Sequence, residues 1–272
     1  MFEYEQRDIA VQSRRIKNRL RRGVFLLPAM FTSANLLCGY YAVLASLMGT
    51  MDDFDHAAKA IGFAILFDSL DGRIARMTGT NTEFGVQFDS LADVVSFGIA
   101  PAVLAYAWGV RSLPASIGQT AQLLEEIGWV CCLIFLVCCA WRLARFNVQG
   151  MAPGGSKFFV GMPTPAAAGV IAAIVHGFKV PLQDWRWSLA WLLLAAGLGA
   201  LMTSTIRYYS FKDIPWTRRQ PSLAIVLLLM LVGVIWRFSE FALVILASAY
   251  AVTGVVLHIV RLLRHRLVSR TA

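Results

Sequence analysis

Charged residues are scarce in this chain: Asp, Glu, Lys and Arg make up only 15% of its 272 residues, whereas 58% are hydrophobic. With a mean hydropathy of +0.62, this composition excludes an ordinary soluble domain and predicts a chain that lies in a lipid bilayer. Histidine is also rare, with four residues scattered outside the acidic region described below, so we assign none of them a catalytic role.

Cysteine is infrequent, and its placement excludes a disulfide framework. Four of the five cysteines form two doublets seven residues apart in one apolar stretch: Cys131, Cys132, Cys138 and Cys139. A soft-metal site would need thiolates in lipid, so we favour the interpretation that these side chains are small apolar packing residues. The chain also lacks internal repeats and low-complexity linkers, which indicates a single integral-membrane domain.

Long apolar runs dominate the remainder and predict an all-α, polytopic helical bundle of about eight transmembrane helices. The expected spans are 24–49, 57–78, 85–110, 123–145, 164–180, 187–209, 221–237 and 239–262. The first run is too long for a cleaved secretory signal and indicates a plain first helix or a signal anchor. An even number of spans places both termini on one side, and the positive-inside rule makes that side the cytoplasm of an inner-membrane protein. The first outer loop then carries Asp52, Asp53 and Asp55.

The segment 1–23 is polar and basic, and the whole chain has a net charge of +9. Its basic residues are distributed over helix ends rather than along one soluble face, which favours anionic membrane lipids over nucleic acid as a partner. Two interpretations of 1–23 remain open: an amphipathic helix on the inner leaflet, or a basic tail that serves only topology.

The most informative feature is a set of four aspartates inside apolar stretches: Asp68, Asp71, Asp89 and Asp93. A lone carboxylate in the bilayer costs several kcal/mol, so such a set is expected to bind something positive. Residues three or four apart share a helix face, so each pair projects together and the short segment between the helices can bring both pairs face to face. Carboxylate oxygens suit two Mg²⁺ or Mn²⁺ ions, which together promote phosphoryl displacement.

Arg73 and Arg76 lie beside the first acidic pair and supply positive charge suited to phosphate. In the alternative interpretation they only mark the cytoplasmic helix end and pair with the acids. Four acids against two arginines leave negative charge uncompensated, which argues against that alternative.

Polar residues elsewhere leave further alternatives open. Thr32 and Asn35 share one side of the first helix and can either hydrogen-bond a nucleotide or hold helices together. The inner segment 146–163 is rich in Gly and Pro, which predicts a loop folded against the membrane face rather than a continuous helix.

The aspartates stand in the pattern D-x2-D-G-x2-A-R-x8-G-x3-D-x3-D, which the chain matches without a departure and which resembles the signature of the CDP-alcohol phosphotransferases. The resemblance implies a six-helix core, a homodimer, and displacement of CMP from a CDP-linked lipid by an alcohol. By the same resemblance the four aspartates hold a divalent-metal pair, with Asp93 also the candidate base. The residues that it places at the CDP portion are Gly72, Ala75, Arg76 and Gly85; Thr32 and Asn35 are further candidates for nucleotide binding.

Three further segments are similar to those of the integral-membrane phosphatidylserine synthases of bacteria and archaea: 142–147, 157–165 and 204–212. This similarity implies CDP-diacylglycerol and L-serine as substrates, at a site that faces the cytoplasm. The candidates for binding the acceptor or the lipid phosphate are Arg142, Arg145, Arg207 and Lys212, with simple topology anchors as the alternative. The resemblance assigns 24–212 to the family core and 213–272 to two additional C-terminal helices.

Two other functions compete with this interpretation. One is an enzyme of the same family that uses another alcohol, such as glycerol 3-phosphate or inositol phosphate. The other is a cation transporter with an acidic coordination site. Transport favours acids near the bilayer midplane and paired halves with broken helices, whereas this sequence places its acids at one membrane face and has no repeat.

Overall fold

The computed structural model describes residues 29–78, 82–149, 158–209, 242–251, 253–254 and 256. Within them the protein is helical except for one two-stranded antiparallel ladder. The elements are the first helix (Ala29–Met48), α2 (Met51–Thr78), α3 (Glu83–Asp93), η1 (Val94–Ile99), α4 (Ala100–Tyr106), η2 (Ala107–Arg111), η3 (Ala115–Ile117), α5 (Gln119–Gln149), β1 (Phe158–Val160), α6 (Thr164–Phe178), α7 (Trp185–Thr203) and β2 (Arg207–Tyr209). This architecture confirms the predicted helical class.

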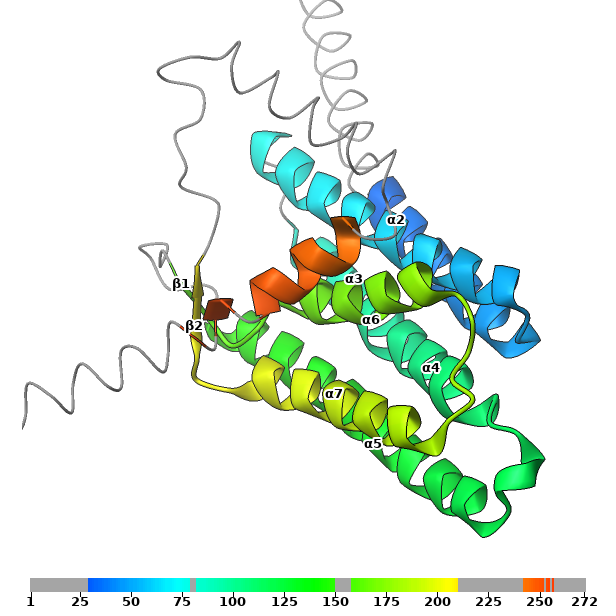
Figure 1. The fold of residues 1–272 in the computed structure, drawn as a ribbon. Helices are drawn as coiled ribbons and strands as arrows, with labels where there is room; N and C mark the ends of the chain where they lie inside the picture. The colour runs from blue at the N-terminus through cyan, green and yellow to red at the C-terminus, as the bar shows by residue number, and fades with distance from the viewer. Residues whose placement is uncertain are drawn as a thin grey trace, which may run out of the picture.

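The helices pack in pairs, with α5 along α7 and α2 along α6 (Figure 1). Their shared core is rich in alanine and includes Phe54, Phe97, Phe135 and Ile171, all nearly or fully buried. Small side chains let helix backbones approach closely, which matters in lipid because dispersion contacts rather than water exclusion drive helix association. The bundle thereby holds α2 and α3 in one fixed arrangement.

One long helix runs over Glu83–Arg111 and contains two π-helical segments, η1 and η2. The first of these begins at Val94, directly after the last residue of the aspartate pattern. A π turn inserts one residue into the helical ladder and changes the direction in which the following side chains project, and such turns are frequent at functional sites. The helix therefore changes its register beside Asp93.

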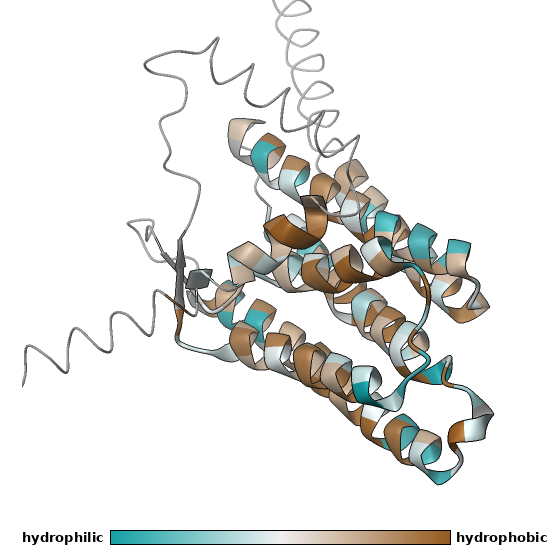
Figure 2. Ribbon diagram, viewed as in Figure 1, coloured by the Kyte–Doolittle hydropathy of each residue, from teal (hydrophilic) through white to brown (hydrophobic). Residues whose placement is uncertain are grey.

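Four helices of the described residues are long and apolar enough to cross a membrane: Ala29–Met48, Glu83–Arg111, Gln119–Val148 and Trp185–Thr203. Thr164–Phe178 and Ala242–Ala251 are shorter apolar helices. Hydrophobic residues cover much of the helical bundle (Figure 2), and many large apolar side chains are exposed, as expected of a surface in contact with lipid. The chain is therefore a membrane protein. The expected span 221–237 lies outside the described residues, and so do both ends of the expected span 239–262.

Two predicted boundaries were wrong. Asp52, Asp53 and Asp55 are not in a loop, because α2 already begins at Met51 and acidic residues in a first turn stabilise the helix dipole. The helix expected over 187–209 ends at Thr203, since Ser204 takes an extended conformation.

The described ends of the segment 146–163, which was predicted as a loop, contain regular secondary structure. Helix α5 continues to Gln149, while β1 pairs with β2, so that Val160 lies opposite Arg207. Gly161 follows β1 with a φ of +82°, and a Cβ there would lie 2.3 Å from the Met202 carbonyl oxygen, so only glycine fits. This contact ties the segment to the end of α7.

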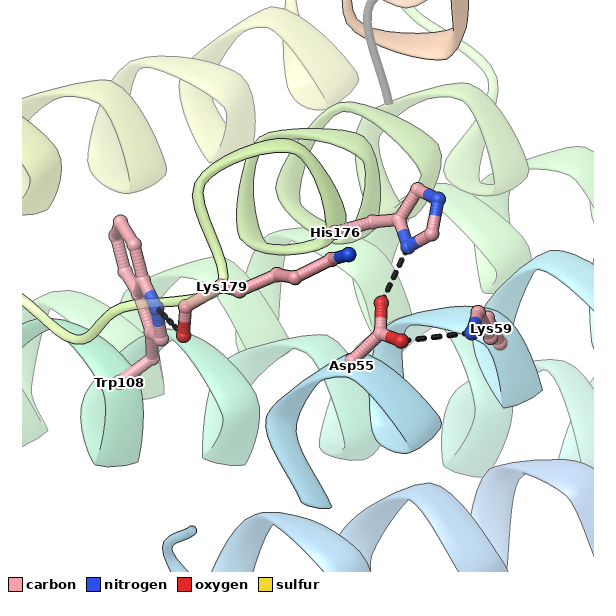
Figure 3. Close-up of polar contacts among 5 residues, drawn as sticks. All are labelled: Asp55, Lys59, Trp108, His176 and Lys179. Atoms are coloured by element: carbon pink, nitrogen blue, oxygen red, sulfur yellow. Dashed lines mark hydrogen bonds and ion pairs between the residues drawn. The ribbon is translucent and has the colours of Figure 1, made fainter. Parts of the chain in front are cut away.

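A polar cluster lies in the first turns of α2; its carboxylate, Asp55, is 13 residues before Asp68, or about 20 Å along the helix axis. Asp55 contacts His176 Nδ1 through Oδ1 at 2.5 Å and Lys59 Nζ through Oδ2 at 2.7 Å (Figure 3). Burial raises the pKa of the Asp55 carboxyl, but the hydrogen bonds from Lys59 and His176 outweigh it and hold that pKa below its usual value. The cluster joins α2 to α6.

Candidate metal centre and active site

Helices α2 and α3 bring three of the predicted acids together. One carboxylate oxygen from each of Asp68, Asp71 and Asp89 lies within 4.8 Å of the others. Asp93 is outside this group and lies one turn further along α3, where it is buried. The structure therefore confirms the predicted juxtaposition of the two helices and distinguishes a compact cluster of three carboxylates from a fourth, separate carboxylate.

The start of α3 is fixed by an N-cap close to the end of α2. Helix α2 ends at Thr78 and α3 begins at Glu83, with Thr82 as its N-cap. The Thr82 side-chain oxygen accepts a hydrogen bond from the Gly85 amide at 3.0 Å, which satisfies one of the unpaired donors at a helix start. The cap fixes where α3 begins and thereby places Asp89 opposite the end of α2.

The donor set fits a hard divalent cation. All the grouped ligand atoms are carboxylate oxygens, and Asp89 Oδ1 is buried without a hydrogen-bond partner among the described residues. Among the described residues, neither Asp68 nor Asp89 forms an ion pair with a basic side chain. Carboxylates this close repel one another, and a buried acceptor without a donor is costly, so a bound cation resolves both problems. The cluster can therefore bind a metal.

The first helix donates to two of the acids. Thr32 Oγ1 donates to Asp71 Oδ2 at 2.9 Å, and Asn35 Nδ2 donates to Asp93 Oδ1 at 3.0 Å. Both donors are buried, with exposed fractions of 4% for Thr32 and 0% for Asn35. The alternative that these residues hold helices together is thus observed directly, while their contact with a nucleotide stays a prediction.

The four residues predicted at the nucleotide lie on both helices. Gly72 and Ala75 are half-buried on α2, and Gly85 is half-buried in the first turn of α3. Arg76 is part of α2, and its side chain is outside the described atoms. Arg73 is exposed. A Cβ on Gly85 would lie 3.0 Å from Thr82 Oγ1, the oxygen that caps α3.

The predicted basic residues fall into two groups. On α5, Arg142 Nη1 donates to Thr164 Oγ1 and Arg145 Nη1 donates to the Thr203 carbonyl, both at 3.4 Å. Arg142 Nε is buried and has no hydrogen-bond partner among the described residues. Of the other two, Arg207 is described only as backbone in β2, and Lys212 lies outside the described residues.

Comparison with known proteins decides the family. The model of the CDP-alcohol phosphatidyltransferases matches residues 25–201. The chain belongs to this family. The match covers the acid-bearing helices and continues through α5 and α6 into α7, so it confirms the resemblance found in the aspartate pattern.

Several relatives of the chain share one name. A CDP-diacylglycerol–serine O-phosphatidyltransferase of Helicobacter pylori is 32% identical over 234 residues, covering 86% of this chain and 91% of that protein. A protein of that name from Methanocaldococcus jannaschii is 31% identical, with coverage of 88% and 96%. Among solved structures, a phosphatidylinositol phosphate synthase of Mycobacterium tuberculosis in complex with manganese and citrate is similar, with 22% identity, coverage of 69% and 82%, and a TM-score of 0.44.

Sequence reasoning missed two polar contacts of this family member. Asn147 Nδ2 donates to Ser90 Oγ at 2.8 Å, which joins the end of α5 to the residue after Asp89. Ser96 Oγ donates to the Asn35 carbonyl at 2.9 Å. Asn147 stands in the segment 142–147 that was singled out for its arginines, so an amide there was a usable signal, whereas Ser96 in an apolar helix gave none.

Proposed function

We propose that this protein transfers the phosphatidyl group of CDP-diacylglycerol to the hydroxyl of L-serine, releasing CMP and leaving phosphatidylserine in the membrane. The observation that carries the proposal is the cluster of Asp68, Asp71 and Asp89 between two helices of a CDP-alcohol phosphatidyltransferase. Relatives that cover most of the chain and are named for this reaction support serine as the acceptor.

Asp68, Asp71 and Asp89 would hold two divalent ions, Mg²⁺ or Mn²⁺, with Asp93 contributing to the second. When bound, such ions neutralise the pyrophosphate and the departing phosphate. The donor chemistry supports this assignment, because the site offers hard oxygen ligands and includes a buried carboxylate oxygen without a partner among the described residues.

Asp93 is the proposed base. Its separation from the three grouped carboxylates leaves it one helical turn beyond the cluster, where an incoming hydroxyl can meet it. In the overall reaction a bond forms between the serine oxygen and the phosphatidyl phosphorus, and the pyrophosphate P–O bond breaks with its electron pair leaving on CMP. The proton of the serine hydroxyl passes to the Asp93 carboxylate.

The remaining residues would bind the two substrates. Gly72, Ala75, Arg76 and Gly85 approach the CDP portion, because two of them lack a side chain and one is basic. Arg142 and Arg145 lie on the same helix, three residues apart, and are proposed for the serine carboxylate or the lipid phosphate. We assign Arg207 and Lys212 the same role.

The acceptor separates this proposal from a family member that uses glycerol 3-phosphate or inositol phosphate. A Methanothermobacter relative named archaetidylserine synthase is 36% identical over 187 residues. Its name differs from that of the other relatives in the lipid and agrees with them in serine, which supports serine as the shared acceptor.

The site would face the cytoplasm of the inner membrane, with both termini on that side. The basic ends of the predicted spans support this orientation. The proposed organisation comprises an interfacial segment 1–23 that meets anionic lipids, a core of 24–212, two further helices in 213–272, and a homodimer.

The test is CMP release by purified protein in detergent with CDP-diacylglycerol and Mn²⁺ or Mg²⁺. L-serine, glycerol 3-phosphate and inositol phosphate are added in separate reactions. Release that depends on serine and stops with a chelator supports the proposal. CMP release only with another alcohol would keep the reaction type and replace serine as the proposed acceptor. Absence of release with every acceptor would overturn the proposed transferase activity.

A further inference from the structure

Two neutral side chains of the first helix each hold one acid of the site. Thr32 and Asn35 lie three residues apart on one helix face, and they donate to Asp71 and Asp93 at 2.9 and 3.0 Å. We infer that Thr32 and Asn35 are positioning residues, Thr32 orienting Asp71 for metal binding and Asn35 orienting Asp93 for its encounter with the serine hydroxyl. The inference rests on the proposed function for the second role only.

The chemistry of these donors suits the task. A carboxylate has two oxygens and about four lone-pair directions. A neutral donor restricts rotation of the carboxylate by occupying one oxygen, Oδ2 in Asp71 and Oδ1 in Asp93, without adding charge to the site. A Lys or Arg at either position would instead bring positive charge beside the metal pocket. Donors behind ligand groups orient them and strengthen binding in the same way.

Asn35 makes two hydrogen bonds to the helix that carries Asp93. Its side chain donates to Asp93, while its backbone carbonyl accepts from Ser96 Oγ at 2.9 Å. One turn later, a Cβ on Gly39 would lie 2.4 Å from Ser96 Oγ, so the two helices are in close contact. The amide is thus fixed relative to the π-helical turn that follows Asp93. Such a support can set the direction of a carboxylate rather than merely fill space.

The second atom of the Asn35 amide supports the same conclusion. Asn35 Oδ1 is buried and has no hydrogen-bond partner among the described residues. An apolar side chain of similar volume would fill this position without leaving an acceptor unpaired, and buried polar atoms without partners require an explanation. The explanation offered by the geometry is the Nδ2 donor to Asp93, which leucine lacks.

The first arm of the test measures Mn²⁺ binding to full-length protein in detergent without substrates, from the electron paramagnetic resonance signal of unbound Mn²⁺. Thr32→Val removes the hydroxyl at nearly constant shape, and we expect binding to weaken by about 10-fold or more. Thr32→Ser restores the hydroxyl and should return affinity to within about threefold of wild type. Unchanged affinity in Thr32→Val, or a loss that Thr32→Ser does not repair, overturns the role of Thr32.

The second arm measures steady-state kinetics of Asn35→Leu. We expect kcat to fall by about 10- to 100-fold, while KM for CDP-diacylglycerol stays within about threefold. A raised KM for CDP-diacylglycerol at unchanged kcat would instead make Asn35 a nucleotide-binding residue and overturn the inference. Asn35→Ala carries the same expectation and needs no additional space if the leucine variant does not give a monodisperse protein.

Ser33→Ala is the matched control for both arms. Ser33 lies between the two residues, is exposed, and donates only within its own helix, to the Ala29 carbonyl at 2.7 Å. It should bind Mn²⁺ and turn over as the wild type does. If wild-type protein shows no CMP release with serine, the proposed function fails while the Mn²⁺ arm still decides the role of Thr32.

Discussion

Gly39 and Ser96 are in contact without room for a side chain between them: a Cβ on Gly39 would lie 2.4 Å from Ser96 Oγ and 2.7 Å from Ser96 Cα. The first contact is with the end of a side chain and the second with backbone, so rotation of Ser96 alone does not relieve it. The first helix and the helix that carries Asp93 therefore meet at the smallest separation that the backbone permits.

Gly39→Ala should destabilise the protein because the added methyl group forces these helices apart. Overpacking of this kind costs about 1–3 kcal/mol, and we expect the midpoint of thermal unfolding in detergent to fall. Gly62→Ala on α2 is the control, since a Cβ there meets nothing within 4 Å. That change should leave stability unchanged or raise it by up to about 1 kcal/mol. Equal effects of the two variants would contradict the close contact.

Asp89→Asn should abolish turnover without preventing membrane insertion. The change removes one negative charge and replaces a carboxylate oxygen of the cluster by an amide nitrogen, so Mn²⁺ binding and CMP release should both fall. We expect kcat to fall by more than about 100-fold. Even the loss of a residue that only supports a metal ligand lowers metal affinity or activity by about 10- to 100-fold. Asp52→Asn, an exposed acid in the first turn of α2, should behave as wild type. Normal activity in a folded Asp89→Asn protein would exclude the metal site.

Arg142→Lys should impair substrate binding although it keeps the positive charge. Lysine keeps the positive charge but cannot reproduce the planar fork that reaches Thr164. If Arg142 binds the serine carboxylate, KM for serine should rise by about 10-fold while KM for CDP-diacylglycerol changes little. A rise in the KM for CDP-diacylglycerol instead would assign the guanidinium to the lipid phosphate, and no change in either would leave Arg142 as a topology anchor.

Asp55→Asn should destabilise the protein and leave catalysis intact. The variant removes the carboxylate that contacts His176, which is buried, and Lys59, which is half-exposed, and this costs about 1–3 kcal/mol. Thermal unfolding measures this loss, and Mn²⁺ binding should be unchanged because Asp55 lies about 20 Å along α2 from Asp68. Weakened Mn²⁺ binding in this variant would show that the two ends of α2 are coupled.

The same carboxyl predicts a pH dependence of stability. The pKa of Asp55 is held below its usual value, so its ionised form is favoured in the folded protein. The resulting stabilisation is fully present above the unfolded pKa of about 3.9 and is lost as pH falls through the lower folded pKa. Unfolding midpoints measured from pH 6 to pH 3 should therefore fall less in Asp55→Asn than in wild type. Parallel curves would contradict this assignment.

The aspartate pattern predicted the pocket because its spacing has direct geometric consequences. Two residues three apart on α2 and two residues four apart on α3 must each share a face, and only the reversal near Thr82 was needed to oppose them. The helical class followed equally well from the apolar runs, since a backbone in lipid must satisfy its hydrogen bonds internally.

Contacts between distant segments were beyond such reasoning. Asn35 and Asp93 are 58 positions apart, Ser90 and Asn147 are 57 apart, and Asp55 and His176 are 121 apart. No local pattern specifies which polar side chains meet across a bundle, so Thr32 and Asn35 suited a nucleotide and a helix contact equally. The β1–β2 ladder escaped prediction for the same reason, because each strand has only three residues.

The hydrogen bonds from the first helix to Asp71 and Asp93 also bear on how the protein is made. Every acid of the cluster and both of its neutral donors lie between Thr32 and Asp93, within roughly the first third of the chain. The ribosome therefore synthesises all of these side chains, on three successive helices, before it reaches Arg142. The proposed metal site is thus encoded in one contiguous segment, whereas the residue proposed for the acceptor is made later, on α5.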